Sequence, residues 1–272
     1  MRLQVETVVS VPFDENTYVV WREGRTDALV IDPGLEPDLI LACLAGHGLT
    51  VAAVLNTHGH ADHIGGNEAM KRAFPDAPLV IGAGDVEMLI DAWANLSALF
   101  GQPITSPPAD RVVREGEVVE YAGISLEVRD IPGHSPGHVV FVHRDTPCHV
   151  FGGDVLFRGS IGRYDFPGGD GPLLLAGIRE KLFSLPDDTV VYPGHGPVTT
   201  VGREKRSNPY FGKAHPGSGY GAAGSIILIL LWVAYSSMIL FYGAEFTKAW
   251  ADHYHGIVAA GEHAVKDSGR ES

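Results

Sequence analysis

The chain has 272 residues, 45% of them hydrophobic and 19% charged, and its formal net charge at pH 7 is −13. This composition suits one large α/β domain, with or without an appendage, and argues against a nucleic-acid partner held by bulk electrostatics. Neither Cys43 nor Cys148 belongs to a Cys-x-x-Cys pair, and the first residues lack the apolar core of a secretory signal. A reducing cytosol is therefore the expected compartment.

Strands and helices alternate along the chain up to about residue 200. β-branched and aromatic runs predict strands, which lie within residues 3–32 (three strands) and at 51–55, 79–81, 112–113, 118–119, 125–128, 139–142, 149–151 and 190–192. Helical periodicity predicts helices over 36–46, 67–74, 85–100 and 173–185. On the third of these helices, Trp93, Leu96 and Phe100 either pack in the core or cover the mouth of a site.

A histidine-rich loop, residues 57–66, follows the buried strand at 51–55 and contains His58, His60, Asp62 and His63. A loop at the carboxyl end of a strand is where α/β folds place their sites. The first two histidines can reach one metal ion, and the aspartate and third histidine can turn to a second. Imidazole and carboxylate ligands together suit zinc, iron or manganese. A single histidine is more often structural, but this density of ligand-type residues favours a metal site.

Single ligand-type residues recur at later strand ends, namely His134, Asp154 and His195. Rigid strands can bring ligands that are distant in sequence to one buried dinuclear site. Asp32, at the end of the third strand, is either a turn residue or a carboxylate that orients a ligating histidine. His138 is interpreted as a structural residue at the start of a strand.

Four segments together resemble the metallo-β-lactamase-fold hydrolases, namely residues 57–66, 132–138, 153–154 and 193–197. The closer resemblance is to the short single-domain bacterial members of the glyoxalase II (hydroxyacylglutathione hydrolase) branch. It extends over residues 1–212, and residues 153–159, 162–166 and 208–210 also look like that branch. The resemblance implies an α/β fold, a four-layer αβ/βα sandwich in which two sheets face each other and helices lie outside.

The resemblance also implies two divalent metal ions, zinc first, with iron or manganese as alternatives. By motif position, one ion would be held by His58, His60 and His134, the other by Asp62, His63 and His195, and Asp154 would bridge them. A hydroxide shared by the two ions would attack the carbonyl carbon of a thioester such as S-D-lactoylglutathione. Asp62 would orient this nucleophile as well as bind metal. The expected protein is a metallohydrolase of small-molecule thioesters.

Substrate specificity is less constrained by the sequence. Arg163 occupies the position at which the glyoxalase II branch carries a basic residue for a glutathione carboxylate, and an ion pair with Asp165 is the structural alternative. The helical domain of full-length glyoxalase II is not recognisable after residue 200. Other esters or lactones therefore stay open as substrates.

Three other functional classes compete with the thioesterase. A mononuclear-iron persulfide dioxygenase of the same fold would need only ligands such as His58, His134 and Asp154. A true β-lactamase is disfavoured by the bridging aspartate and by the lack of a predicted signal peptide. A membrane-tethered binding module with a vestigial site is disfavoured by the intact set of seven ligand positions.

The C-terminal part of the chain has a different composition. Residues 213–221 are interpreted as a linker, 222–246 as a hydrophobic helix and candidate transmembrane span, and 247–272 as a polar tail. The stretch resembles the last membrane helix of the YihY/BrkB family. Because 222–244 carries no charge and basic residues precede it, it predicts an inner-membrane anchor with a cytoplasmic catalytic domain. A core helix and a fusion remnant without a role are the alternatives.

Overall fold

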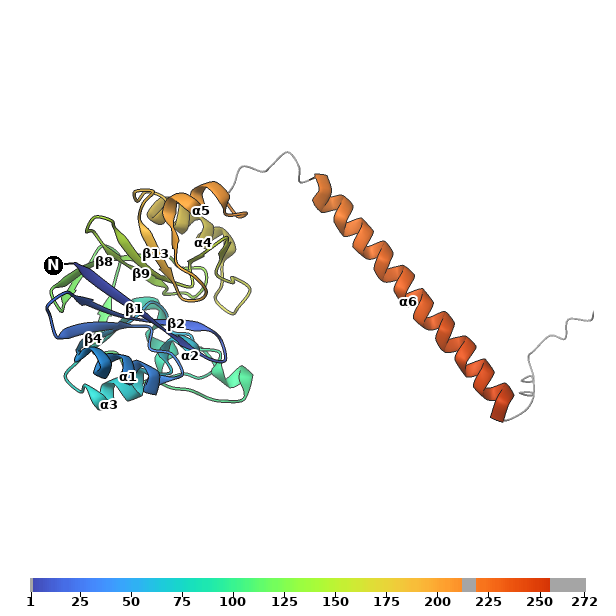
Figure 1. The fold of residues 1–272 in the computed structure, drawn as a ribbon, viewed down its shortest axis with the longest axis horizontal. Coiled ribbons are helices and arrows are strands. Elements are labelled where there is room, and N and C mark those ends of the chain that lie inside the picture. The colour runs from blue at the N-terminus through green and yellow to red at the C-terminus, as the bar shows by residue number, and fades with distance from the viewer. Residues whose placement is uncertain (1, 212–218, 255–272) are drawn as a thin grey trace, which may run out of the picture. The chain divides into compact units, whose positions relative to one another are not determined.

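The computed structural model describes residues 2–211 and 219–254, with side chains in the second range described at 230, 232–250 and 253. The chain divides into two units, Met1–Gly212 and Lys213–Ser272. The first unit is built on two sheets of six strands each (Figure 1). The catalytic residues predicted from the sequence all belong to this unit.

The first sheet has the strand order β1-β2-β3-β4-β5-β6. Its strands are β1 (Leu3–Ser10), β2 (Glu15–Arg22), β3 (Asp27–Ile31), β4 (Thr50–Asn56), β5 (Leu79–Gly82) and β6 (Arg111–Val113). The first three pair antiparallel, and β3 to β6 pair parallel. The parallel strands β3, β4 and β5 are buried almost throughout, as expected for strands that are covered on both faces.

The second sheet has the order β14-β13-β10-β9-β8-β7. Its strands are β7 (Val118–Tyr121), β8 (Ile124–Asp130), β9 (Val139–His143), β10 (His149–Gly153), β13 (Val190–Pro193) and β14 (Thr199–Thr200). Only β10 and β13 pair parallel, so both end at the same edge of this sheet. A two-stranded ribbon, β11 (Leu156–Phe157) and β12 (Ser160–Ile161), follows β10.

Helices cover the outer face of each sheet (Figure 1). The helices of this unit are α1 (Pro37–His47), α2 (Ala61–Ile64), α3 (Asn67–Ala73), α4 (Gly171–Gly177) with the π-helical turn η3 (Ile178–Leu182), and α5 (Val201–Ser207). Ile40 and Leu44 of α1 pack on the first sheet, whereas Leu174 of α4 and Val201 of α5 pack on the second. The predicted four-layer αβ/βα sandwich is therefore confirmed.

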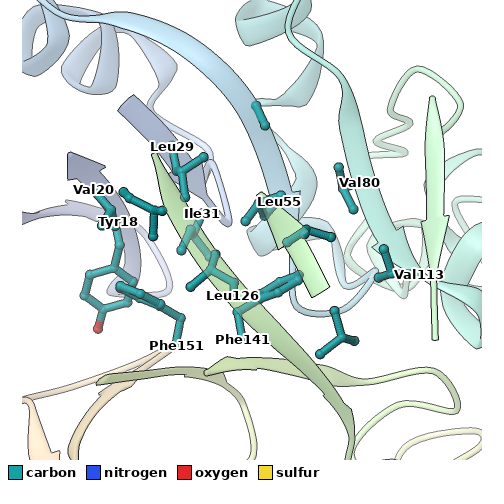
Figure 2. Close-up of a cluster of buried hydrophobic side chains, with 14 of the residues drawn as sticks. Tyr18, Val20, Leu29, Ile31, Leu55, Val80, Val113, Leu126, Phe141 and Phe151 are labelled. Carbon is teal, nitrogen blue, oxygen red and sulfur yellow. The ribbon is translucent and has the colours of Figure 1, made fainter. Parts of the chain in front are cut away.

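Phe141 of β9 lies between the two sheets, in a cluster of buried side chains that both sheets supply (Figure 2). Because it is fully buried, we expect Phe141→Ala to lower the free energy of unfolding by about 3–5 kcal/mol. Urea unfolding followed by near-UV circular dichroism measures this loss. Val118→Ala on β7, where the side chain is 57% exposed, is the matched control and should cost far less. A loss below about 1 kcal/mol for Phe141→Ala would contradict this packing.

The predicted helix over 85–100 is wrong. The structure has two short 3-10 helices there, η1 (Ala83–Leu89) and η2 (Ser97–Phe100), joined by turns. Leu96 adopts a left-handed backbone with φ of 71°, which no α-helix contains. The side chains of Asn95 and Ser97 hydrogen-bond to local backbone groups, and such bonds compete with helix formation.

The second unit contains one long helix, α6 (Gly219–Tyr254), which extends past the predicted end at 246. Polar side chains at Ser236, Ser237, Glu245 and Lys248 interrupt its described apolar residues. Within the part of the chain that the structure describes, no helix combines the length and the hydropathy needed to cross a bilayer. The predicted membrane anchor over 222–246 is therefore not supported. Most of the predicted linker and the side chains of 222–229 lie outside the described residues.

Candidate metal centre

Seven side chains that the sequence singled out meet beyond the ends of strands from both sheets. Strand β4 ends at Asn56, and the loop after it leads into α2, which carries Asp62 and His63. The other five ligand positions lie on connections that follow β4, β8, β10 and β13, in the order His58 and His60, His134, Asp154, and His195. The packing of the two sheets against each other thus brings loops that are far apart in sequence to one place.

Three histidines form the first cluster. His58, His60 and His134 are buried, and each offers a ring nitrogen within 4.8 Å of the other two. His60 Nδ1 lies 2.9 Å from His134 Nε2. Three imidazole nitrogens that converge on one point are a common ligand set for zinc and iron.

Asp62, His63 and His195 form the second cluster, again with ligand atoms within 4.8 Å of one another. His195 Nε2 lies 3.3 Å from Asp62 Oδ2 and 3.4 Å from His63 Nε2. The side chain of Asp62 is 21% exposed, whereas His63 is fully buried. One carboxylate and two imidazoles therefore converge on a point that solvent reaches on the side of Asp62.

Asp154 lies between the two clusters. Its Oδ2 is 3.4 Å from His134 Nε2 and 3.5 Å from His195 Nε2, and its Oδ1 is 3.5 Å from His63 Nε2. One carboxylate thus contacts members of both clusters, which is the arrangement that a bridging ligand requires.

The unsatisfied polar atoms show that this donor set fits metal ions. Within the described residues, His58 Nε2 and Asp154 Oδ1 are buried without a hydrogen-bond partner, a costly state unless a ligand binds them. Three imidazoles also donate their Nδ1–H away from the centre: His134 to the Arg163 carbonyl (2.7 Å), His63 to Asp32 (3.1 Å) and His195 to the Phe13 carbonyl (3.0 Å). The Nε2 atom of each of these rings is left facing the centre. Hydrogen bonds from the other ring nitrogen orient metal-ligating histidines in the same way.

Burial and neighbouring charges separate the pKa values of these groups. Burial and the neighbouring His134 lower the pKa of His60 to about 3, and burial also holds the pKa of His58 far below its usual range. Burial would lower the pKa of His63 too, but the carboxylates of Asp62 and Asp154 outweigh it and raise that pKa. For Asp62, the charges of the two nearby imidazoles outweigh burial and lower the carboxyl pKa.

Asp32 proves to be an orienting carboxylate. It is buried at the end of β3 with a left-handed backbone, φ 50°, a conformation that aspartate tolerates better than most residues. Its carboxylate accepts hydrogen bonds from the Thr57 backbone N–H (2.7 Å), the Thr57 hydroxyl (2.6 Å) and His63 Nδ1 (3.1 Å). It therefore holds both the start of the histidine-rich loop and one histidine.

The loop that carries His195 is fastened to the start of β2 by Asn16. The side-chain amide of Asn16 donates to the carbonyls of Pro193 (3.0 Å) and Gly196 (2.8 Å), and its backbone N–H donates to Gly194 (2.7 Å). Asn16 is buried, so these bonds are shielded from water. Sequence analysis did not identify this residue, because its partners lie almost 180 residues away.

Two further buried residues support the centre. His138 stacks on His58 at 4.8 Å, and its Nε2 accepts the backbone N–H of Asp154 at 3.0 Å. Its structural interpretation therefore holds, with the addition that it positions Asp154. Asp85, which sequence analysis missed, accepts hydrogen bonds from the Gly59 N–H (3.1 Å) and from residues 135 and 137 (both 2.6 Å). It joins the two loops that carry the first cluster.

We expect Asp85→Ala to destabilise the protein by about 3 kcal/mol, because three donors lose their buried acceptor. The affinity of the first cluster for metal should also fall about 10- to 100-fold, as when other partners of a metal site are removed. Urea unfolding and equilibrium dialysis with Zn²⁺ measure the two effects. Glu87→Ala, an exposed position on the same helix η1, is the matched control. Equal behaviour of the two variants would contradict the role of Asp85.

A cavity of about 610 Å³ opens over the centre. Asp62, Asp154, His195 and Arg163 are among the residues that line it. The guanidinium of Arg163 forms a bidentate pair with Asp165 (2.9 and 2.8 Å), so the predicted ion pair is present. Leu96 and Phe100 also line the cavity, so for these two residues the structure favours the alternative that they cover the mouth of the site. Trp93 is 69% exposed and does not line the cavity.

Comparison with known proteins agrees with this geometry. The model of the metallo-beta-lactamase superfamily matches residues 11–195. Hydroxyacylglutathione hydrolase GloC of Haemophilus influenzae is 36% identical over 211 residues, which are 76% of this chain and 98% of that protein. None of the comparisons supports the resemblance of the C-terminal part to the YihY/BrkB family.

Solved structures share the fold of the first unit. The BLEG-1 B3 metallo-beta-lactamase is 37% identical, with a TM-score of 0.73 over 76% of this chain and 99% of that one. The di-iron-bound form of TTHA1623 is 41% identical (TM-score 0.67; 76% and 100% covered), and ETHE1 from Myxococcus xanthus is 29% identical (0.62; 76% and 83%). The chain belongs to the metallo-beta-lactamase superfamily.

Proposed function

We propose that this protein is a dinuclear metal-dependent hydrolase of thioesters. The observation that carries the proposal is the pair of ligand clusters joined by Asp154 at the floor of a cavity. The relative GloC, by name a hydroxyacylglutathione hydrolase, supports the thioester class. In this proposal His58, His60 and His134 hold one ion, Asp62, His63 and His195 hold the other, and Asp154 bridges them.

Two bound divalent ions would lower the pKa of a shared water towards ~7 and polarise the substrate carbonyl. Asp62 can assist the attack of this water on the carbonyl. The lowered pKa of Asp62 keeps its carboxylate ionised, and the side chain lines the cavity. The carboxylate can therefore accept a hydrogen bond from an O–H of the attacking water and orient that water. Asp32 and the Phe13 carbonyl keep the rings of His63 and His195 in the required orientation.

The cavity chemistry also favours a thioester over an amide. Every His and Asp among the described residues that line it is a metal ligand in this proposal, and no Cys, Lys or Tyr lies beside them to protonate a leaving group. A thiolate, whose thiol has a pKa near ~8.5, leaves without such help, whereas an amine does not. Arg163 is the proposed contact for a carboxylate on the thiol part, for example in a glutathione conjugate.

The donor set contains imidazole and carboxylate without thiolate, which suits zinc and also iron or manganese. The di-iron-bound form of TTHA1623 makes iron a metal to test beside zinc. It also keeps the mononuclear-iron persulfide dioxygenase as a second candidate, since that chemistry would need only part of the ligand set.

The test combines metal analysis with two assays on one preparation of the full chain. Two ions per chain, with turnover of S-D-lactoylglutathione or another thioester, would support the proposal. One iron per chain, with oxygen uptake on glutathione persulfide, would replace it by the dioxygenase. A chain that binds no metal would refute both.

A further inference from the structure

Aromatic and aliphatic side chains form most of the wall around the proposed reaction centre. Phe157 meets His195 edge-to-face at 6.1 Å, and Phe166 meets His60 in the same way at 5.6 Å. The apolar wall is contributed by segments far apart in sequence, among them Phe13, Leu96, Phe100, Ile104, Phe157 and Phe166. A substrate carbonyl placed between the two ligand clusters would therefore have hydrocarbon on several sides.

This wall is held in place by a specific hydrogen-bond network. Asn95 is fully buried, and its amide donates to the carbonyls of Met88 and Ile104, both at 2.9 Å. Its Oδ1 accepts from the backbone N–H of Ser97 at 3.0 Å and from the Ser97 hydroxyl at 2.6 Å. Between them, Leu96 is kept in the left-handed conformation and is only 6% exposed. Backbone strain maintained at a cavity wall points to a role for that wall.

The mouth of the cavity is apolar as well. Phe13, from the turn after β1, and Phe100, at the end of η2, meet edge-to-face with ring centroids 5.8 Å apart. They are 44% and 64% exposed. Large exposed aromatic side chains at a cavity mouth are typical of a surface that is covered when a ligand binds.

Charged and polar partners are few in comparison. Arg163 is the only Lys or Arg among the described residues of the lining, and its guanidinium is already paired with Asp165 and stacked at 4.2 Å on Phe166. The amide of Asn95 and the hydroxyl of Ser97 are engaged with each other, so Gln102 is the remaining uncharged polar side chain among the described residues of the lining. Glutathione alone brings two carboxylates and one ammonium group. A hydroxylated acyl group such as D-lactoyl would find little in this wall to bind its hydroxyl.

We propose that the preferred substrates are thioesters with a large hydrocarbon acyl group, aliphatic or aromatic, rather than the D-lactoyl group. This inference rests on the proposed thioesterase function. The acyl chain lies against the wall formed by Leu96, Phe100 and Phe166, and each buried methylene contributes up to about fourfold to kcat/KM.

The test uses glutathione thioesters of one series, so that only the acyl group changes: D-lactoyl, acetyl, butyryl, hexanoyl and phenylacetyl. We expect kcat/KM to rise by at least about tenfold from acetyl to hexanoyl, and D-lactoyl to fall below hexanoyl. A flat series, or D-lactoyl as the best substrate, would overturn the inference and leave the thioesterase function standing. No hydrolysis of any member by the metal-loaded protein would instead refute the proposed function.

Two variants on one helix sharpen the result. Phe100→Ala should lower the ratio of hexanoyl to acetyl kcat/KM about fivefold or more, because the substrate loses an aromatic contact. Leu99→Ala, 59% exposed on the same helix and outside the lining, should leave the ratio unchanged. A ratio that Phe100→Ala does not change would also overturn the inference.

Discussion

Replacing Asp154 by alanine should lower kcat/KM for thioester hydrolysis by about three orders of magnitude, equivalent to the loss of about 4 kcal/mol of transition-state stabilisation. The reason is geometric, because this carboxylate lies within 3.5 Å of His134 in the first ligand cluster and of His63 and His195 in the second. Without it, each cluster should bind its ion more weakly, and metal content should fall below two ions per chain.

Asp154→Asn separates ligation from folding, because it keeps the side-chain shape and removes the charge. Both variants should retain the far-UV circular dichroism of the parent protein. Asp188→Ala, an exposed acidic position outside the cavity lining, serves as the control and should keep full activity. If Asp154→Asn binds two ions and hydrolyses thioesters within tenfold of the parent, the bridging role is wrong.

Removal of metal should abolish hydrolysis and lower the melting temperature by about 10 °C. An ion present at a thousand times its dissociation constant stabilises a protein by about 4 kcal/mol, and each kcal/mol shifts the melting temperature of a protein of this size by roughly 2–4 °C. In the metal-free protein, buried atoms such as His58 Nε2 and Asp154 Oδ1 remain without partners. Differential scanning calorimetry before and after dialysis against a chelator measures the shift.

Restoring activity with Zn²⁺, Mn²⁺ and Fe²⁺ in separate samples would identify the metals that support turnover. Activity that survives complete removal of metal would contradict the whole catalytic argument. An unchanged melting temperature would contradict only the stabilising role of the ions.

Acidification should empty the two clusters unequally. The pKa of His63 is raised in the metal-free protein, so below that pKa a metal ion must displace a proton to bind there. His60, with its pKa lowered to about 3, carries no proton to displace. As the pH falls below the pKa of His63, the second cluster should lose affinity by about tenfold per pH unit for each displaced proton, and the first should lose less. Parallel loss of both ions in equilibrium dialysis would contradict this ordering.

The convergence of the seven proposed ligand residues was predictable because each follows a strand that its own sequence marks clearly. The run at 51–55 is part of β4, and the loop after it contains four ligand-type residues within a few positions. The supporting residues were not predictable in the same way. Asp85 and Asn16 act on backbone groups that are distant in sequence, and a single aspartate or asparagine gives no local pattern that distinguishes this use.

The segment over 85–100 shows why the conformation of the cavity wall could not be predicted from the sequence either. Apolar spacing there predicts a helix, but Asn95 and Ser97 offer the backbone alternative hydrogen bonds, and the chain forms two 3-10 helices instead. The helix propensity of this segment was overridden by hydrogen bonds from the Asn95 side chain to the carbonyls of Met88 and Ile104, which only the folded chain brings together.

The fastening of the His195 loop to the start of β2 has a consequence for biosynthesis. Asn16 emerges from the ribosome before its partners at Pro193 and Gly196, which follow it by 177 and 180 residues. The second ligand cluster therefore cannot exist on a nascent chain until nearly the whole domain has been translated. If this cluster binds metal as proposed, its loading would be a late event, and the bound ion would join residues from opposite ends of the domain sequence.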